Sequence, residues 1–343
     1  MQKSAVLCGL GAYLPETVVT NDDLAEIMDT TDEWITSRTG IRERRVVGPG
    51  ISTGDLAVRA GARALKSAGG EPVDLVILAT TTPDHPCPAT APFVAHRLGL
   101  VDTPAWDLSA VCSGFLYGLT AASSFIAAGA ARRVLLIGAD AFSTILAPAD
   151  RGTRPIFGDG AGAVVLRPGD PGEPGALGPS VLGSDGSLRE LITVQAGGSR
   201  EPLDPAEPDQ EGRYFTMQGR SVFRHAVARM TAVTEEVRER AGWRPEDVDC
   251  LVAHQANRRI LQAVAERLGL PMERCALHLD RVGNTAAASI PLAMADAVGR
   301  GGLLPGHRVL LTAYGGGATW GAAALTWPDI TPQPDGRERA SEG

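Results

Sequence analysis

A short pattern of residues occurs twice in this chain, and the spacing of the two copies restricts the fold more than any other feature. VDLVILA at residues 73–79 resembles VDCLVAH at residues 248–254, which lie 175 residues further on. RVLL at residues 133–136 recurs at residues 308–311, at the same offset of 175. A period this long excludes a solenoid and indicates two similar halves. Two such halves packed face to face would place a binding site at their junction.

Apolar runs rich in β-branched residues alternate with alanine-rich stretches along both halves. The apolar runs predict strands at residues 73–80, 133–138, 163–166, 248–254, 308–313 and 322–327. The alanine-rich stretches predict helices at residues 55–68, 114–128, 221–241, 258–268 and 287–299. Strands that alternate with helices and are bounded by glycine predict an α/β fold with largely buried sheets.

Two segments depart from this alternation. Residues 167–213 are rich in proline, glycine and acidic side chains, so we expect a connection between the halves with an excursion near residues 183–194. Residues 328–343 are polar, and we expect them to form a frayed tail.

The composition excludes several classes of protein. The chain has 343 residues, of which 44% are hydrophobic, so it can bury a large core and global disorder is excluded. The net charge of −8 argues against a strongly basic nucleic-acid binder. Only Lys3 and Lys66 are lysines, and neither lies in a motif, which disfavours Schiff-base chemistry.

The cysteines and the first residues indicate a reducing compartment. The five cysteines are irregularly spaced and include no CxxC pair, so neither a disulfide framework nor a zinc site is expected. The first residues lack the apolar stretch of a signal peptide. No window approaches the roughly 18 consecutive apolar residues of a membrane span. We therefore expect a cytoplasmic enzyme without membrane association.

Cys112 is the strongest candidate for a nucleophile. A strand-like stretch precedes it, and a helix-forming stretch begins at Gly114. Unpaired N–H groups and the positive end of the helix dipole at such a position lower a thiol pKa and favour the thiolate. A buried structural cysteine is the alternative interpretation, and it is the better one for Cys8, Cys250 and Cys275.

His254 ends a predicted strand and is followed by helix-forming sequence. Open α/β sheets place their ligands at such strand ends. A histidine hydrogen-bonded beneath a loop is the alternative. That alternative suffices for the other five histidines, which have no comparable setting: His85, His96, His225, His278 and His307.

An asparagine and two glycine-rich loops complete the set of candidates. Asn284 precedes a predicted helix, where a plain N-cap is the simpler interpretation of the residue alone. Three glycines follow Tyr314; they permit positive φ and could offer N–H groups to an oxyanion. This loop does not fit a phosphate-binding P-loop. The glycine-rich loop at residues 157–162 indicates a tight structural turn.

Taken together, these residues resemble β-ketoacyl-acyl-carrier-protein synthase III, a family with the thiolase fold. The resemblance runs from residue 9 to residue 325. Its most specific stretches are residues 9–15, 31–42, 150–153, 157–162, 254–257, 283–285 and 315–317. The resemblance implies a layered αβαβα sandwich of two duplicated halves. Residues 1–170 would carry the cysteine, residues 171–328 the histidine and asparagine, and residues 329–343 would form a disordered tail.

The resemblance also implies a role for each candidate. Cys112 would attack an acyl-CoA thioester and carry the acyl group. His254 and Asn284 would bind the thioester carbonyl of malonyl-carrier protein and stabilise the enolate that forms as CO₂ leaves. Backbone N–H groups of Cys112 and Gly316 would hold the tetrahedral oxyanion. No metal or redox cofactor is implied.

Two binding surfaces follow from the resemblance. Trp34 and Arg151 match the pair that grips the adenine of CoA. The other positions of the CoA channel are Thr30, Arg38, Gly219, Phe223 and Asn257. The acidic acyl carrier protein would dock on Arg224, Arg259 and Arg267. Glu266 stands where the family often has a further basic residue, which would weaken this patch.

One departure from the family pattern bears on the substrate. Cys87 stands where short-chain members carry a phenylalanine, which lies at the interface of a homodimer and helps to close the acyl pocket. Cysteine is smaller, so we expect a longer or wider pocket, although Phe142 could fill some of the space. The sequence leaves the identity of the acyl starter open.

The resemblance keeps two functions in view. The first is decarboxylative Claisen condensation of an acyl-CoA starter with malonyl-carrier protein, in fatty-acid initiation or polyketide priming. The alternative is a relative that transfers the acyl group to a hydroxyl or amine without decarboxylation. The presence of Cys112, His254 and Asn284 favours condensation. It also argues against a ketosynthase-like partner that lacks the nucleophile.

Overall fold

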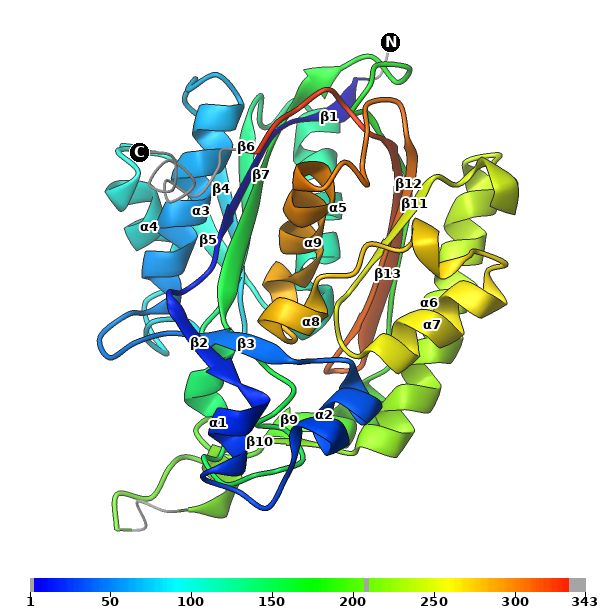
Figure 1. The fold of residues 1–343 in the computed structure, drawn as a ribbon. Coiled ribbons are helices and arrows are strands. Elements are labelled where there is room, and N and C mark those ends of the chain that lie inside the picture. The colour runs from blue at the N-terminus through cyan, green and yellow to red at the C-terminus, as the bar shows by residue number, and fades with distance from the viewer. Residues whose placement is uncertain (1–2, 207–209, 333–343) are drawn as a thin grey trace, which may run out of the picture.

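The computed structural model describes residues 3–206 and 210–332, so most of the tail expected at residues 329–343 lies outside the described residues. Two β-sheets stand side by side, with helices between them and on both outer faces (Figure 1). Within the described ranges, no helix is long and apolar enough to cross a membrane.

The first sheet is built from the N-terminal part of the chain. Its strands follow the order β1, β7, β6, β4 and β5. Their bounds are Ser4–Tyr13 for β1, Gly160–Gly169 for β7, Val134–Asp140 for β6, Leu75–Ala79 for β4 and Ala105–Leu108 for β5. β4 is parallel to β5 and β6, whereas β7 is antiparallel to β6 and β1. All residues of β4 and β6 are buried, as expected for strands covered on both faces.

The second sheet repeats this arrangement with the C-terminal part of the chain. Its strands follow the order β11, β12, β13 and β8. Their bounds are Cys250–Ala253 for β11, Arg308–Gly315 for β12, Thr319–Thr326 for β13 and Leu177–Ser184 for β8. β11 and β12 are parallel, and the other two pairs are antiparallel. A parallel bridge from Leu251 to Cys275 occupies the place that β5 has in the first sheet. The order and directions of the strands therefore confirm the duplication.

The helices form three layers around the two sheets (Figure 1). α3 (Thr53–Ser67) covers the outer face of the first sheet. α5 (Gly114–Ala127) and α9 (Ser289–Gly299) lie between the two sheets. α6 (Gly219–Arg240) and α7 (Arg258–Arg267) cover the outer face of the second sheet. This order of layers is the αβαβα arrangement that the resemblance implies.

The local sequence explains where the helices of these layers form. Ser52 and Asp55 make a capping box at the start of α3, with hydrogen bonds in both directions. α5 and α9 are apolar on most of their surface, because a sheet covers each side of the middle layer. Gly138 of β6 marks a close approach between the halves, because a Cβ there would lie 2.4 Å from the carbonyl oxygen of Ala287. Only glycine fits at that contact between the halves.

Shorter elements surround the ends of the sheets. They are β2 Thr17–Thr20, α1 Asn21–Ala25, α2 Asp32–Thr39, β3 Glu43–Val46, α4 Ala91–Arg97, β9 Ile192–Val194, β10 Phe215–Met217 and α8 Leu279–Val282. β2 pairs with β3, and β9 pairs with β10, each antiparallel.

The predicted strands and helices agree in type with the observed ones, with differences of a few residues at their ends. One expectation is wrong. Residues 167–213 do not only connect the halves, because β8 lies within them and forms an edge of the second sheet. No residue of β8 is buried, and only Gly178 and Ser184 are exposed. The alternation of buried and exposed residues is therefore too weak to predict this strand from the sequence.

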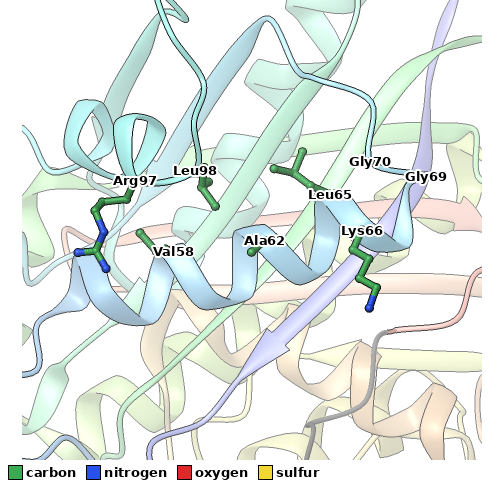
Figure 2. A pocket seen from close by; sticks show the side chains of 8 residues that line it. All are labelled: Val58, Ala62, Leu65, Lys66, Gly69, Gly70, Arg97 and Leu98. Carbon is green, nitrogen blue, oxygen red and sulfur yellow. The ribbon is translucent and has the colours of Figure 1, made fainter.

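A surface groove follows the outer side of α3 (Figure 2). It is lined by Val58, Ala62, Leu65, Lys66, Gly69, Gly70, Arg97 and Leu98. None of the candidate site residues lines this groove. Because α3 covers the outer face of the first sheet, the groove lies on the side away from the junction of the two halves.

Candidate active site

Cys112 lies in a 3₁₀ turn, Val111–Ser113, directly before α5. Val111 has a φ of +47°, which is strained for a β-branched residue and turns the chain sharply ahead of the cysteine. The hydroxyl of Ser113 bonds the carbonyl oxygen of Ala110 and Oγ1 of Thr319, both at 2.8 Å. The turn is therefore held to the second sheet as well as to its own half.

The thiol of Cys112 differs from the sequence-based expectation. Burial, and after it the charge of Asp140, raises the pKa of Cys112 far above its usual range. The backbone N–H at the turn opposes this shift but is the smallest of the three influences. The expectation that the start of the helix lowers this pKa is therefore wrong here, because desolvation of the thiolate outweighs the dipole.

His254 follows β11 at the end of the second sheet. Its backbone N–H donates to the carbonyl oxygen of Thr312 on the neighbouring strand at 2.8 Å. Burial lowers the pKa of His254 to about 3, so the imidazole is neutral at pH 7. Among the described residues, Nδ1 has no hydrogen-bond partner. A neutral imidazole carries one N–H, so His254 can offer one donor to a ligand.

Asn284 is held by its backbone and by its side-chain oxygen. Its N–H donates to the carbonyl oxygen of Ile156 at 2.8 Å, and its carbonyl oxygen accepts from Gly158 at 3.0 Å. Its Oδ1 accepts from the N–H of Ala286 at 2.9 Å, two residues further on. The side chain of Asn284 thus holds the first N–H of the 3₁₀ turn Ala286–Ala288, whose N-cap is Thr285, and it does not cap α9. Because Oδ1 accepts this hydrogen bond, Nδ2 is the side-chain group of Asn284 that can donate to a ligand.

The glycine loop after β12 packs directly on the cysteine turn. A Cβ at Gly315 would lie 2.9 Å from the backbone nitrogens of both Cys112 and Ser113. A Cβ at Gly316 would lie 3.3 Å from Cγ2 of Val111. The close approach that the three glycines predicted is therefore an approach to the candidate nucleophile.

Aromatic rings form a wall beside Cys112. The thiol shares one buried cluster with Phe142, Phe157 and Phe215. The rings of Phe142 and Phe157 stack with centroids 4.3 Å apart, and Phe215 meets both edge-on at 5.0 Å. The expectation of a tight turn at residues 157–162 is wrong, because Phe157 forms a parallel bridge with Asn284 and residues 160–162 begin β7. The stretch supplies one of these rings. Sequence reasoning missed Phe157 and Phe215, and no motif marks Phe215.

Cys87 and Phe142 occupy different environments. Phe142 is fully buried beside Cys112, whereas Cys87 is exposed on the loop after β4. That loop is tied to β5, since the carboxylate of Asp107 accepts from the N–H groups of Thr90 and Ala91. Within one chain the structure therefore places only Phe142 at the cysteine.

Two guanidinium groups lie over the indole ring of Trp34. Cζ of Arg38 is 4.5 Å from the centroid of the indole, and Cζ of Arg151 is 4.6 Å from it. Nδ2 of Asn257 donates to the carbonyl oxygen of Arg38 at 3.1 Å, which joins α2 to the start of α7. Of the remaining channel residues, Thr30 stands two residues before α2, and Gly219 begins α6. Phe223 is exposed on the first turns of α6.

The arginines of the expected docking patch are exposed on two neighbouring helices. Arg224 lies on α6, and Arg259 and Arg267 lie on α7. Glu266 is also exposed, and its carboxylate accepts from Gln262. In the described part of the chain, no three His, Cys, Asp or Glu side chains gather as a metal-binding group.

Comparison with known proteins identifies this arrangement. The family 3-oxoacyl-[acyl-carrier-protein (ACP)] synthase III matches residues 106–186, and its C-terminal domain matches residues 238–327. β-Ketoacyl-[acyl-carrier-protein] synthase III 3 of Streptomyces coelicolor is 61% identical over 97% of this chain and 100% of its own length.

Solved structures agree with the sequence comparison. 3-Oxoacyl-(acyl carrier protein) synthase III of Pseudomonas aeruginosa superposes with a TM-score of 0.90 at 52% identity, covering 96% of this chain and 100% of that chain. The priming β-ketosynthase of the R1128 polyketide pathway has a TM-score of 0.88 at 33% identity, covering 97% and 98%. The chain therefore belongs to the β-ketoacyl-[acyl-carrier-protein] synthase III family of acyl-transferring condensing enzymes with the thiolase fold.

Proposed function

We propose that this enzyme condenses an acyl-CoA starter with malonyl-acyl-carrier protein through an acyl group carried on Cys112. The observation that carries the proposal is the meeting of three elements at one junction. The turn of Cys112, the turn of Asn284 and the glycine loop at Gly315 come together there, at the ends of strands from both sheets.

The first half-reaction loads the nucleophile. Sulfur of Cys112 forms a bond to the thioester carbon while the bond to the CoA sulfur breaks. The cysteine proton passes to the CoA sulfur, so CoA leaves as a thiol. The backbone N–H groups of Cys112 and Gly316 hold the negative oxygen of the tetrahedral intermediate. A nucleophile that stays protonated until attack suits this exchange, because proton loss accompanies bond formation.

The second half-reaction uses the donors of the other half. The bond between CO₂ and the malonyl carbon breaks, and its electron pair moves into an enolate. The N–H of neutral His254 and the Nδ2 group of Asn284 stabilise the enolate oxygen. The enolate carbon then attacks the acyl carbonyl on Cys112, and the sulfur leaves as a thiolate that takes up one proton from solvent. This sequence uses no metal and no redox cofactor.

Binding of the two substrates is assigned to different surfaces. The Trp34 stack with Arg38 and Arg151 is suited to an adenine, and Asn257 braces it. We assign Thr30, Gly219 and Phe223 to the same CoA channel. The acidic carrier protein docks on Arg224, Arg259 and Arg267, which are exposed on α6 and α7.

A homodimer formed along the edge of the first sheet accounts for the exposed features there. β5 is the end strand of that sheet, and such an edge invites pairing with a second copy. Trp106 of β5 contacts Phe125, and both Phe125 and Phe93 are exposed aromatic residues. Cys87 lies on the loop tied to β5, so the partner's acyl pocket is the one that it would help to close.

We assign residues 1–170 to the half that carries Cys112 and residues 171–328 to the half that carries His254 and Asn284. A cytoplasmic location follows from the chemistry, because the nucleophile must remain a reduced thiol. Acyl transfer to a hydroxyl or amine is not favoured, since it would make no use of the donor pair for an enolate. The names of the relatives also describe synthases.

Intact-mass spectrometry with a panel of acyl-CoAs tests the assignment of the nucleophile. The wild type gains one acyl mass, and Cys112→Ala gains none. A variant that is acylated at the wild-type rate would show that another residue carries the acyl group.

Release of CO₂ from malonyl-carrier protein tests the donor pair. His254→Ala and Asn284→Ala lose about 10²–10³-fold in decarboxylation, while they keep substantial acylation of Cys112. If Asn284→Ala condenses at the full rate, its role is limited to capping the turn that follows it.

A further inference from the structure

Asp140 is a buried carboxylate that the proposed reaction does not use. It ends β6, and none of its surface is exposed to solvent. Oδ1 accepts from the N–H of Thr81 at 2.7 Å and from the hydroxyls of Thr80 and Thr82, both at 3.2 Å. Oδ2 accepts from the N–H of Ala287 at 3.0 Å. A carboxylate without solvent and with four hydrogen bonds is a costly feature that needs an explanation.

These bonds join the two halves at the active site. Thr80, Thr81 and Thr82 follow β4 of the first sheet, whereas Ala287 lies in the turn after Asn284. The preceding N–H in that turn, on Ala286, is held by Oδ1 of Asn284. One turn of the C-terminal half is therefore held by a side chain from each half.

The internal repeat shows what Asp140 replaces. The offset of 175 residues relates the cysteine turn, Val111–Ser113, to the turn Ala286–Ala288. Val111 and Ala286 have φ values of +47° and +46°, so the two turns share an unusual backbone conformation. The same offset relates Cys112 to Ala287, and Gly315 to Asp140.

The equivalent positions 140 and 315 carry different side chains. Beside Ala287, the Asp140 carboxylate receives the backbone N–H. Beside Cys112, Gly315 has no side chain, and even a Cβ would lie 2.9 Å from the backbone nitrogen. A carboxylate oxygen thus occupies, in one half, the position where the proposed reaction places a transient oxyanion in the other half. Burial raises the pKa of Asp140 to about 6, so this oxygen is negative at pH 7.

We propose that Asp140 is a positioning residue: its carboxylate occupies the C-terminal counterpart of the oxyanion site and thereby fixes the turn that orients Asn284. This inference rests on the proposed function for its catalytic consequence. Asp140 also has an effect on Cys112 that can be measured without substrate. The charge of Asp140 opposes ionisation of the Cys112 thiol, whereas the neighbouring His254 is neutral and adds no charge.

Asp140→Asn separates a positioning role from a merely structural one. An amide can offer one oxygen, so either Thr81 or Ala287 then faces an NH₂ group. The turn of Asn284 loosens, and decarboxylation of malonyl-carrier protein falls about 10-fold or more. The charge that opposes ionisation of Cys112 is also lost, so alkylation of the thiol by iodoacetamide at pH 8 becomes faster. Acylation of Cys112 therefore stays within a few-fold of the wild-type rate.

Asp74→Asn is the matched control. Asp74 also accepts from two backbone N–H groups, those of Arg132 and Arg133, but it bonds neither the Asn284 turn nor the Cys112 turn. It changes neither the rate of alkylation at pH 8 nor the ratio of decarboxylation to acylation. An Asp140→Asn enzyme that loses both half-reactions equally, with an unchanged rate of alkylation at pH 8, overturns the proposal.

Asp140→Glu provides a second test if the asparagine variant does not fold. It keeps the charge and lengthens the link by one methylene, so decarboxylation falls while the rate of alkylation at pH 8 stays near that of the wild type. Full decarboxylation by this variant also overturns the proposal. If the wild type performs neither half-reaction but Asp140→Asn still speeds alkylation of Cys112, the proposed function is refuted and the electrostatic influence of Asp140 on Cys112 stands.

Discussion

Gly315→Ala tests whether the glycine loop sets the geometry of the nucleophile. The new Cβ would lie 2.9 Å from the nitrogens of Cys112 and Ser113 and 3.0 Å from the carbonyl oxygen of Ala110. Ordinary contacts of a Cβ begin at 3.4 Å, so the loop and the cysteine turn must separate by about half an ångström. All three atoms belong to the backbone of a buried turn, which cannot rotate away as a side chain would.

The expected cost has two parts. Overpacking of this kind lowers the free energy of unfolding by about 1–3 kcal/mol. A misplacement of about 1 Å costs around 10²-fold in rate, so a shift of half that size lowers acylation of Cys112 by roughly 10-fold. Rapid-quench mass spectrometry with a saturating acyl-CoA measures the rate, and urea unfolding measures the stability.

Gly299→Ala is the matched control for this substitution. It lies at the end of α9, and nothing stands within 4 Å of its added Cβ. It keeps the wild-type rate of acylation and is neutral or slightly stabilising. Acylation of Gly315→Ala at the wild-type rate would refute the reasoning, because the loop would then be free to move without consequence for Cys112.

Three further predictions follow from the structure. Burial lowers the pKa of His254 to about 3 and that of His278 to about 4. Below pH 6.5 both histidines bind protons in the unfolded chain but not in the folded chain. Each histidine therefore lowers the free energy of unfolding by about 2 kcal/mol at pH 5. Urea unfolding at pH 8 and pH 5 measures this loss, which is smaller for His278→Phe than for the wild type. Phe142→Ala costs about 3–5 kcal/mol of stability and shifts kcat/KM towards longer acyl-CoAs; an unchanged preference would place the wall elsewhere. Trp34→Ala raises KM for acyl-CoA about 10-fold with little change in kcat, and a loss confined to kcat would contradict the adenine assignment.

The sequence predicts the fold well because short apolar runs mark the buried strands and repeated segments mark the duplication. Apolar runs of four to seven residues become β4, β6 and β12, which are buried on both faces. β1 and β8 were not expected as strands: they carry glycines and no clean alternation, and pairing with distant segments decides their conformation. That information is not present in a single window of sequence.

The site was only partly predictable, for a related reason. Cys112, His254 and Asn284 stand in motifs, whereas Asp140 and Phe215 reach the site from segments without one. The thiol pKa of Cys112 was predicted in the wrong direction, because the dipole at a helix start is local but desolvation depends on the whole surrounding fold. Effects that arise from burial can be stated only once the packing is known.

The repeat leads to a last prediction, which concerns stoichiometry. At the offset of 175 residues, Cys112 corresponds to Ala287 and His254 corresponds to Ala79. The place of Gly315 is taken in the other half by Asp140, whose carboxylate already engages the N–H of Ala287. The proposed nucleophile and histidine thus have counterparts that cannot perform their chemistry, and the counterpart of the oxyanion site is closed by a charge that would repel an oxyanion. One acyl group per chain is therefore expected at saturation, in titrations read by intact mass. A second acyl group that persists in Cys112→Ala would show that the other half retains a site of its own.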